Sequence, residues 1–180
     1  MNEKHAFRQV VVNIETTGVD LAKAHRVVEI AAVELVDRRL TGKCFHTYVN
    51  PGREVDPGAR AVHGLTNEFL QDKPAFGEIA REFLEFVRGA ELVAHNALFD
   101  IGFLDGELAI LKLDPLWKCC PSVIDTLQLA RSLRPGQKNS LGALCSALGV
   151  GTPAGDLHGA LLDARLLAEV FLKITQQRLH

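Results

Sequence analysis

The sequence predicts an α/β fold in which a mixed sheet of about five strands carries helices on both faces. Three observations lead to this prediction. Three β-rich segments lie within the first fifty residues, and a short link joins two of them, as in an antiparallel hairpin. Two short apolar segments then alternate with segments of helical periodicity, as in α/β units. A chain of 180 residues is long enough for one such core and too short for two large domains.

Runs of β-branched and other apolar residues predict the strands. The first run ends at the Thr-Thr-Gly turn at 16–18, and the link at 37–39 is short enough for a hairpin. The two later strands are much shorter than the first three. The predicted strands cover residues 9–14, 26–37, 40–49, 92–94 and 123–124.

Apolar residues that recur every three or four positions predict the helices. The segment 51–58, together with the preceding Asn50, contains Asn-Pro-Gly and Asp-Pro-Gly sequences, which are typical of turns. Asn96 is predicted to be the N-cap of the helix that follows it. The predicted helices cover residues 76–87 and 97–111, a segment that ends at 133, and residues 140–148 and 159–174.

Composition excludes several classes of protein. Hydrophobic residues make up 47% and charged residues 23% of the chain, which are values of an ordinary globular protein. No apolar run approaches the roughly 18 residues of a membrane span, and the first ten residues lack a signal-peptide core. The four cysteines form no Cys-x-x-Cys pair, which favours reduced structural thiols. We therefore expect a cytoplasmic protein without a membrane partner.

The net charge of −2 argues against a domain that holds long nucleic acid by charge alone. A short basic run, Arg131, Arg134 and Lys138, could contact phosphates or could be an ordinary solvated loop. The second interpretation is favoured.

Four polar positions stand at places where α/β proteins bind ligands. Asn13 and Glu15 are two residues apart at the end of the first strand, so their side chains leave the same face. Asp100 opens a helix just after another strand. Asp163 lies in an almost wholly apolar helix, with His158 five residues before it.

Each of these residues also has an ordinary structural explanation. Glu15 alone could be a surface charge, and Asp100 could simply complement the dipole of its helix. His158 could be a surface or capping residue beside Gly159. Asp163 is harder to explain in this way, because its neighbours are apolar. Its carboxylate either faces solvent on a narrow polar stripe of the helix or meets a cation.

Three sequence motifs together resemble those of the DEDDh 3′–5′ exonuclease family. They are VVNIETTG at 11–18, HNALFD at 95–100 and HGALLD at 158–163, in the order and spacing of the family. Longer segments, such as VDPGARAVHGLTNEFLQDKPAF at 55–76 and NSLGALCSALGV at 139–150, resemble its proofreading branch, the epsilon type of bacterial DNA polymerase III. The resemblance extends over nearly the whole chain.

The resemblance implies an RNase H-like sheet and a phosphodiester hydrolysis that uses two divalent cations, Mg²⁺ or Mn²⁺. By motif, Asn13, Glu15, Asp100 and Asp163 occupy the metal positions, and His158 would deprotonate the attacking water. The residues implied to contact the 3′-terminal nucleotide are Thr16, Val62, His63, His95 and Phe99.

The resemblance also implies the domain organisation and the partners. Residues 1–180 would form a single exonuclease domain without the C-terminal segment that binds the polymerase alpha subunit and the sliding clamp. The substrate would be a single-stranded or frayed DNA 3′ end. Some members of the branch also bind a small theta-like subunit.

Asn13 departs from the family pattern, which has Asp at this position. An amide has one acceptor oxygen and no charge, so it bridges two cations poorly. If the change weakens transition-state binding by about 3–5 kcal/mol, hydrolysis slows by roughly 10²–10⁴. Asn13 is either a designed Asp→Asn change or the natural residue of a degenerate enzyme. Since the other motif residues are intact, the sequence favours an exonuclease with a single defect.

Two other functions compete with a proofreading exonuclease. One is a catalytically silent subunit that binds DNA or serves as a polymerase scaffold, which Asn13 would suit. The other is an RNA-trimming exonuclease of the same superfamily.

Overall fold

The computed structural model describes residues 7–151 and 159–176. Its centre is a five-stranded sheet with the strand order β3-β2-β1-β4-β5. β1 pairs antiparallel with β2 and parallel with β4, which confirms the predicted mixed sheet. The strands are β1 (Arg8–Thr16), β2 (Val27–Val36), β3 (Arg39–Tyr48), β4 (Glu91–Ala94) and β5 (Val123–Asp125).

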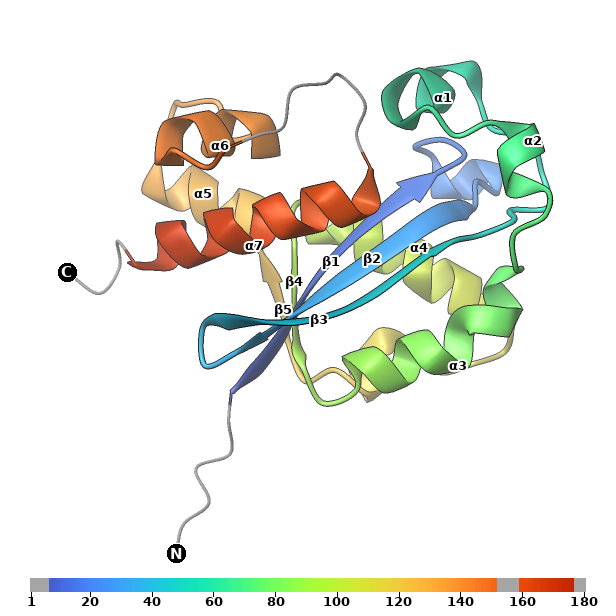
Figure 1. Ribbon diagram of the computed structural model, residues 1–180, viewed down its shortest axis with the longest axis horizontal. Coiled ribbons are helices and arrows are strands. Elements are labelled where there is room, and N and C mark those ends of the chain that lie inside the picture. The colour runs from blue at the N-terminus through green and yellow to red at the C-terminus, as the bar shows by residue number, and fades with distance from the viewer. Residues whose placement is uncertain (1–6, 152–158, 177–180) are drawn as a thin grey trace, which may run out of the picture.

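Helices cover both faces of the sheet, as predicted, and alternate residues of β1 point to opposite sides. Val11 packs with Leu167 and Phe171 of α7 (Ala160–Gln176). Val10 and Val12 belong to the larger core on the other face, which α3 (Phe76–Val87) and α4 (Ala97–Ile110) complete. In Figure 1, α7 lies in front of the sheet and α4 behind it.

The β2–β3 hairpin is tighter than the predicted boundaries suggested. Only Asp37 and Arg38 separate the strands, and both have positive φ angles, of 47° and 63°. Positive φ at both central residues is the geometry of a type I′ turn, which matches the twist of the strands. The Arg38 guanidinium also donates to the Leu172 carbonyl of α7 at 2.8 Å, which anchors the hairpin to this helix.

The prediction of turns throughout 51–58 was wrong at its end. Pro57 begins α1 (Pro57–His63), and a second short helix, α2 (Asn67–Leu70), follows. Proline is favoured in the first turn of a helix because its missing N–H has no intrahelical partner there. Helices this short contain too few residues to show a periodic apolar pattern.

The remaining helices follow the predicted segments closely. α5 (Thr126–Leu133) ends before the Arg-Pro-Gly sequence, and α6 (Leu141–Leu148) begins after Ser140, whose hydroxyl accepts the Ala143 N–H. Two 3₁₀ turns, Leu21–Lys23 and Leu116–Lys118, were not predicted.

Asn96 precedes α4 as predicted, but it does not cap the helix with its side chain. Its backbone is left-handed, with φ 68°, and the structure shows no capping bond from its amide. The Asp125 carboxylate instead accepts the backbone N–H groups of Asn96 and Ala97. The same carboxylate caps α5 through the N–H groups of Leu127 and Gln128. One residue at the end of β5 therefore fixes the start of two helices.

The four cysteines are free thiols, and Cys119 Sγ lies 3.7 Å from Cys120 Sγ. No helix within 7–151 and 159–176 combines the length and apolarity that a membrane span requires.

Candidate active site

The end of β1 presents Asn13 and Glu15 on the face covered by α7. They share this face with Val11, which packs against the helix. In the β1–β2 register, Asn13 is opposite Ala31 and Glu15 is opposite Glu29. The strand therefore brings two of the four motif positions to one place, as the sequence predicted.

Asp100 reaches this place from the first turn of α4. Its Oδ1 accepts the backbone N–H of Ile14 at 3.2 Å, so the second motif is hydrogen-bonded directly to the first. The side chain is buried, and burial raises its pKa to about 7 although the hydrogen bond from Ile14 opposes the shift.

Asp163, half-buried in the first turn of α7, completes the group. It lines the same cleft of about 250 Å³ as Asn13, Glu15 and Asp100. Burial, followed by the charges of Asp163, Glu29 and Asp100, raises the pKa of Glu15 to about 8. Ionised carboxylates repel one another in a desolvated cleft, so a bound cation would stabilise their charged forms.

Of the predicted substrate contacts, the cleft brings together Val62, His95 and Phe99. Val62 comes from α1 and is half exposed, whereas Phe99 is half-buried and packs on Phe103 with ring centroids 4.8 Å apart. An apolar wall beside a group of carboxylates suits a ligand with a flat apolar part and an anionic part, provided that bound cations bridge the anion and the carboxylates.

Thr16 and His63 are buried and are not among the described residues that line the cleft. Thr16 is buried, and its hydroxyl donates to the Gly18 carbonyl at 2.7 Å. His63 accepts the Leu65 N–H at Nδ1, so Nε2 carries the proton and donates to the Thr16 carbonyl at 3.2 Å. Burial lowers the pKa of His63 and favours this neutral form. Both residues position the end of β1, and their predicted contact with the substrate stays a prediction.

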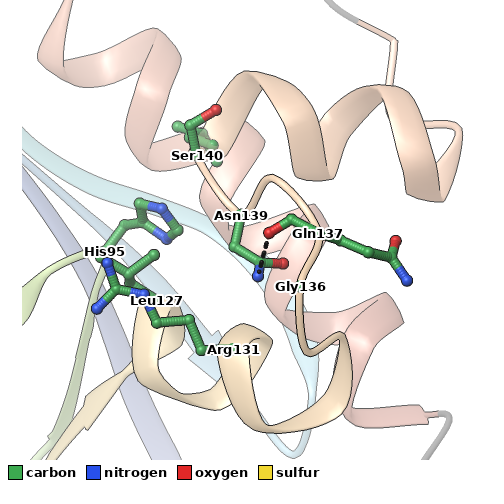
Figure 2. A pocket seen from close by; sticks show the side chains of 8 residues that line it. His95, Leu127, Arg131, Gly136, Gln137, Asn139 and Ser140 are labelled. Atoms are coloured by element: carbon green, nitrogen blue, oxygen red, sulfur yellow. Dashed lines mark hydrogen bonds between the residues drawn. The ribbon is translucent and has the colours of Figure 1, made fainter.

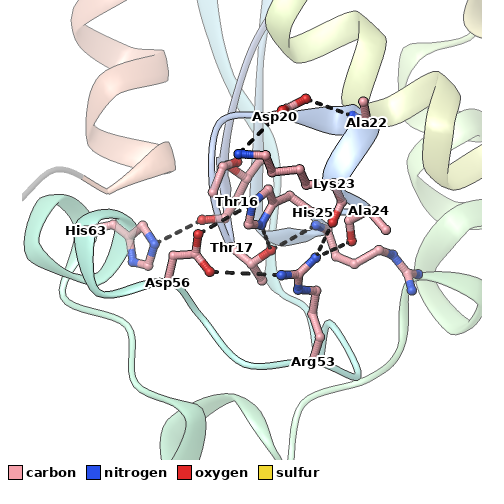
Figure 3. A network of polar contacts seen from close by, with 12 residues as sticks. Thr16, Thr17, Asp20, Ala22, Lys23, Ala24, His25, Arg53, Asp56 and His63 are labelled. Carbon is pink, nitrogen blue, oxygen red and sulfur yellow. Dashed lines mark hydrogen bonds and ion pairs between the residues drawn. The ribbon is translucent and has the colours of Figure 1, made fainter.

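A buried network that the sequence analysis missed supports the same turn (Figure 3). The Thr17 hydroxyl accepts the Arg26 N–H and lies 3.0 Å from Nδ1 of His25. On the other side of the ring, Nε2 is 3.5 Å from the Asp56 carboxylate, just before α1. His25 thus links the first motif to the helix that carries Val62. Nothing in the sequence around position 25 indicates this role, because the contacts join distant segments.

Glu29 is a second residue that sequence reasoning missed. It is buried on β2, accepts the Ala160 N–H at 3.1 Å and pairs with His46 Nε2 at 2.7 Å. A carboxylate at the start of α7 complements the helix dipole and fixes where Asp163 enters the cleft. The signal was present in the sequence, since Glu29 and Glu34 are the two charged residues of the otherwise apolar strand β2.

His95 lies at the end of β4, on the edge of the cleft. Its Nδ1 is 2.9 Å from the Thr126 hydroxyl, which itself donates to the Ala94 carbonyl, so Nδ1 carries the proton. Burial lowers the pKa of the ring, and Nε2 is buried without a hydrogen-bond partner within the described residues. The backbone of Asn139 lies close enough to the ring to oppose this lowering of its pKa (Figure 2).

The donor set fits divalent cations, which prefer carboxylate oxygens. Glu15, Asp100 and Asp163 would hold them, with Asn13 as a neutral fourth position. In the parts of the chain that the structure describes, no three Asp, Glu, His or Cys side chains gather into a cage by themselves. The proposed catalytic base, His158, lies outside the described residues.

Comparison with known proteins now identifies the family. A family model described as "Exonuclease" matches residues 10–171. The chain belongs to the exonuclease family. It is 52% identical to the DNA polymerase III subunit epsilon of Escherichia coli, a match that covers 93% of this chain and 71% of that protein. The epsilon subunit of Rickettsia felis is 47% identical over 96% of this chain and 76% of its own length.

Solved exonuclease structures share the fold. Exonuclease X, solved with a 5′-overhanging DNA duplex, is 30% identical with a TM-score of 0.71, covering 94% of this chain and 92% of that one. The nuclease domain of 3′hExo, a DEDDh family member bound to rAMP, superimposes with a TM-score of 0.80 over 97% of this chain and 94% of that one at 16% identity. These DEDDh neighbours confirm the RNase H-like fold class.

The raised pKa values predict how stability depends on pH in this exonuclease. A carboxyl whose pKa is near 4 when unfolded and 7–8 when folded disfavours the folded state once the pH exceeds the lower value. In EDTA, the unfolding temperature should fall by several degrees between pH 5 and pH 8, and Mn²⁺ should restore more of it at pH 8 than at pH 5. Differential scanning fluorimetry measures both. A temperature that rises over this range in EDTA would contradict the assignment.

The packing of Gly18 on His25 gives a second prediction. A Cβ at Gly18 would lie 2.3 Å from the His25 ring, so Gly18→Ala must displace the imidazole. We expect a loss of about 1–3 kcal/mol in the free energy of unfolding, measured by urea titration. Gly102→Ala, in α4 with open space around the added methyl, is the matched control and should be neutral or slightly stabilising. Equal effects of the two changes would refute the role given to this contact.

Proposed function

We propose that this chain is a proofreading 3′–5′ exonuclease domain of a bacterial replicative DNA polymerase. It removes mispaired 3′-terminal deoxynucleotides as nucleoside monophosphates. One observation carries the proposal: in a chain 52% identical to an epsilon subunit, Glu15, Asp100 and Asp163 line one cleft with an apolar wall.

The residues of the cleft have separable tasks. Glu15, Asp100 and Asp163 would hold two cations, Mg²⁺ or Mn²⁺, which when bound stabilise the attacking and leaving oxygens of the phosphodiester. Phe99 and Val62 pack against the terminal nucleotide. A cleft of about 250 Å³ supports binding of one separated nucleotide. Selectivity for mismatches follows, since a mispaired end unpairs at lower cost.

His158 is proposed as the general base that takes a proton from the attacking water. Only a neutral imidazole accepts a proton, so the rate should rise with pH through the titration of this group. We expect an increase between pH 6 and pH 8.5 that His158→Gln abolishes, measured in single-turnover oligonucleotide assays. A flat profile in the unaltered chain would argue against this base.

The partners follow from the same branch of the family. We propose that the domain acts with the polymerase III alpha subunit in the cytoplasm, with a sliding clamp and a theta-like subunit as further candidates. A net charge of −2 supports weak binding to DNA in isolation. Attachment to a polymerase would then supply the effective concentration of the DNA end.

Asn13 gives the sharpest test of the function. Asn13→Asp restores the missing carboxylate and should accelerate removal of a 3′ nucleotide from a single-stranded DNA oligomer by roughly 10²–10⁴. Gel analysis with Mg²⁺ or Mn²⁺ measures this. The double variant Asn13→Asp/Asp100→Asn is the control and should return to the low rate.

Two outcomes of that experiment would favour other functions. If Asn13→Asp remains inactive on DNA and RNA with both metals, the chain is a silent binding or scaffold subunit. If the revertant shortens RNA faster than DNA of the same sequence, it is an RNA-trimming exonuclease.

A further inference from the structure

Two adjacent cysteines bring their thiols together in the turn before β5. Cys119 ends the 3₁₀ turn Leu116–Lys118, and its Sγ lies 3.7 Å from Cys120 Sγ. The backbone N–H groups of both cysteines donate to the Leu116 carbonyl, at 3.0 and 2.8 Å. In an extended strand, neighbouring side chains would point to opposite faces. The tight turn therefore explains why these two thiols meet.

The surrounding chain holds the two thiols in place. The Cys119 carbonyl accepts the Gly89 N–H at 2.8 Å, and the Cys120 thiol donates to the Val87 carbonyl at 3.4 Å. The Leu116 side chain is buried in the core and anchors the turn from below. Cys120 is buried as well, whereas Cys119 is partly exposed. A ligand that binds both sulfurs thus meets a pair that needs little further ordering.

The pair lies at the opposite end of the sheet from the acidic cleft. Gly89, which is bonded to Cys119, comes just before β4 begins at Glu91. His95, which lines the cleft, comes just after β4 ends at Ala94. The full length of β4 therefore separates the thiols from the cleft, and neither cysteine belongs to the nuclease site.

The distance between the sulfurs suits a bridging atom better than a disulfide. The peptide bond between the two cysteines is trans, so their Cα atoms are about 3.8 Å apart, less than the roughly 4.4–6.8 Å usual for disulfides. An atom bonded to both sulfurs at about 2.3 Å, the length of a metal–thiolate bond, would span the 3.7 Å gap with an S–X–S angle of roughly 107°. A bent chelate therefore fits without moving the backbone.

This geometry narrows the class of ligand. A linear two-coordinate ion with the same bond length would need sulfurs about 4.6 Å apart. A structural zinc ion needs four protein ligands, and among the residues placed by the structure no third Asp, Glu, His or Cys joins the pair. The remaining candidate is a soft centre of pyramidal geometry that brings its own third substituent, since thiolate sulfur prefers soft partners. Trivalent arsenic has these properties.

The surroundings of Cys120 favour an uncharged product. Burial, followed by the neighbouring Cys119 sulfur, raises the pKa of the Cys120 thiol, because a thiolate is poorly solvated there. A ligand that replaces the thiol proton and leaves no net charge on the pair avoids this cost.

We propose that Cys119 and Cys120 form a chelating site for trivalent arsenic compounds of the type R–As(OH)₂. Two As–O bonds break and two As–S bonds form, giving R–As(S–Cys)₂. Each thiol proton leaves with one hydroxide as water, and arsenic stays trivalent, so the step needs no oxidant or reductant. The partly exposed Cys119 forms the first bond, and Cys120 then closes the ring in an intramolecular step.

Phenylarsine oxide, which forms such a compound in water, tests the assignment on the folded chain. Intact-mass spectrometry should show one phenylarsenic group per chain. A large excess of the monothiol mercaptoethanol should leave this group in place, and the dithiol dimercaptopropanol should remove it, because a chelate resists exchange with single thiols. Tryptic digestion of the unaltered chain should locate the group in the peptide 119–131, which contains both cysteines.

Two variants complete the experiment. Cys119→Ser should lose the adduct that resists the monothiol, and circular dichroism verifies that this variant is folded. Cys44→Ser is the matched control, because it removes an exposed cysteine of β3 and should keep the adduct. The assignment is overturned if the group maps to another peptide, if folded Cys119→Ser retains it, or if it forms only in urea. None of these outcomes bears on the proposed nuclease function, which the thiols do not serve.

Discussion

The whole site depends on the close approach of several carboxylates in a partly desolvated cleft. Glu15 shares its surroundings with Asp163, Asp100 and Glu29, and burial together with these charges raises its pKa to about 8. Such an arrangement is unfavourable in isolation. The packing of α7 on one face of the sheet and of α4 on the other supplies the free energy that holds it. Packing of the core thus holds the carboxylates at positions where they repel one another and where bound divalent cations would reduce that repulsion.

Around the acidic residues lies a layer of groups that do no chemistry but decide geometry. Glu29 fixes the start of α7, Asp125 fixes the starts of α4 and α5, and His25 joins the first motif to the segment before α1. Each connects segments that are distant in sequence. The backbone N–H of Ile14 has a similar role, because it binds Asp100 directly to β1.

Asn13 removes one charge from this balance without disturbing the fold. It occupies the strand position and face that the motif requires, opposite Ala31 of β2. An amide has the same shape as a carboxylate, so under the proposed function we expect the change to act on cation binding and not on folding.

The sequence by itself determined the sheet, its long helices and the identity of the acidic positions. These features are encoded locally: alternation in β1, periodicity in α3 and the short motifs around Glu15 and Asp100 all lie within a few turns of chain. Only the tertiary structure decided that His63 faces the Thr16 backbone, that Asp125 and not the Asn96 side chain serves the start of α4, and that Arg131 borders a cavity while Arg134 closes a loop. These roles depend on which distant groups meet and which are buried. A linear pattern does not carry that information, because hydrogen-bond partners and desolvation arise only when the segments pack.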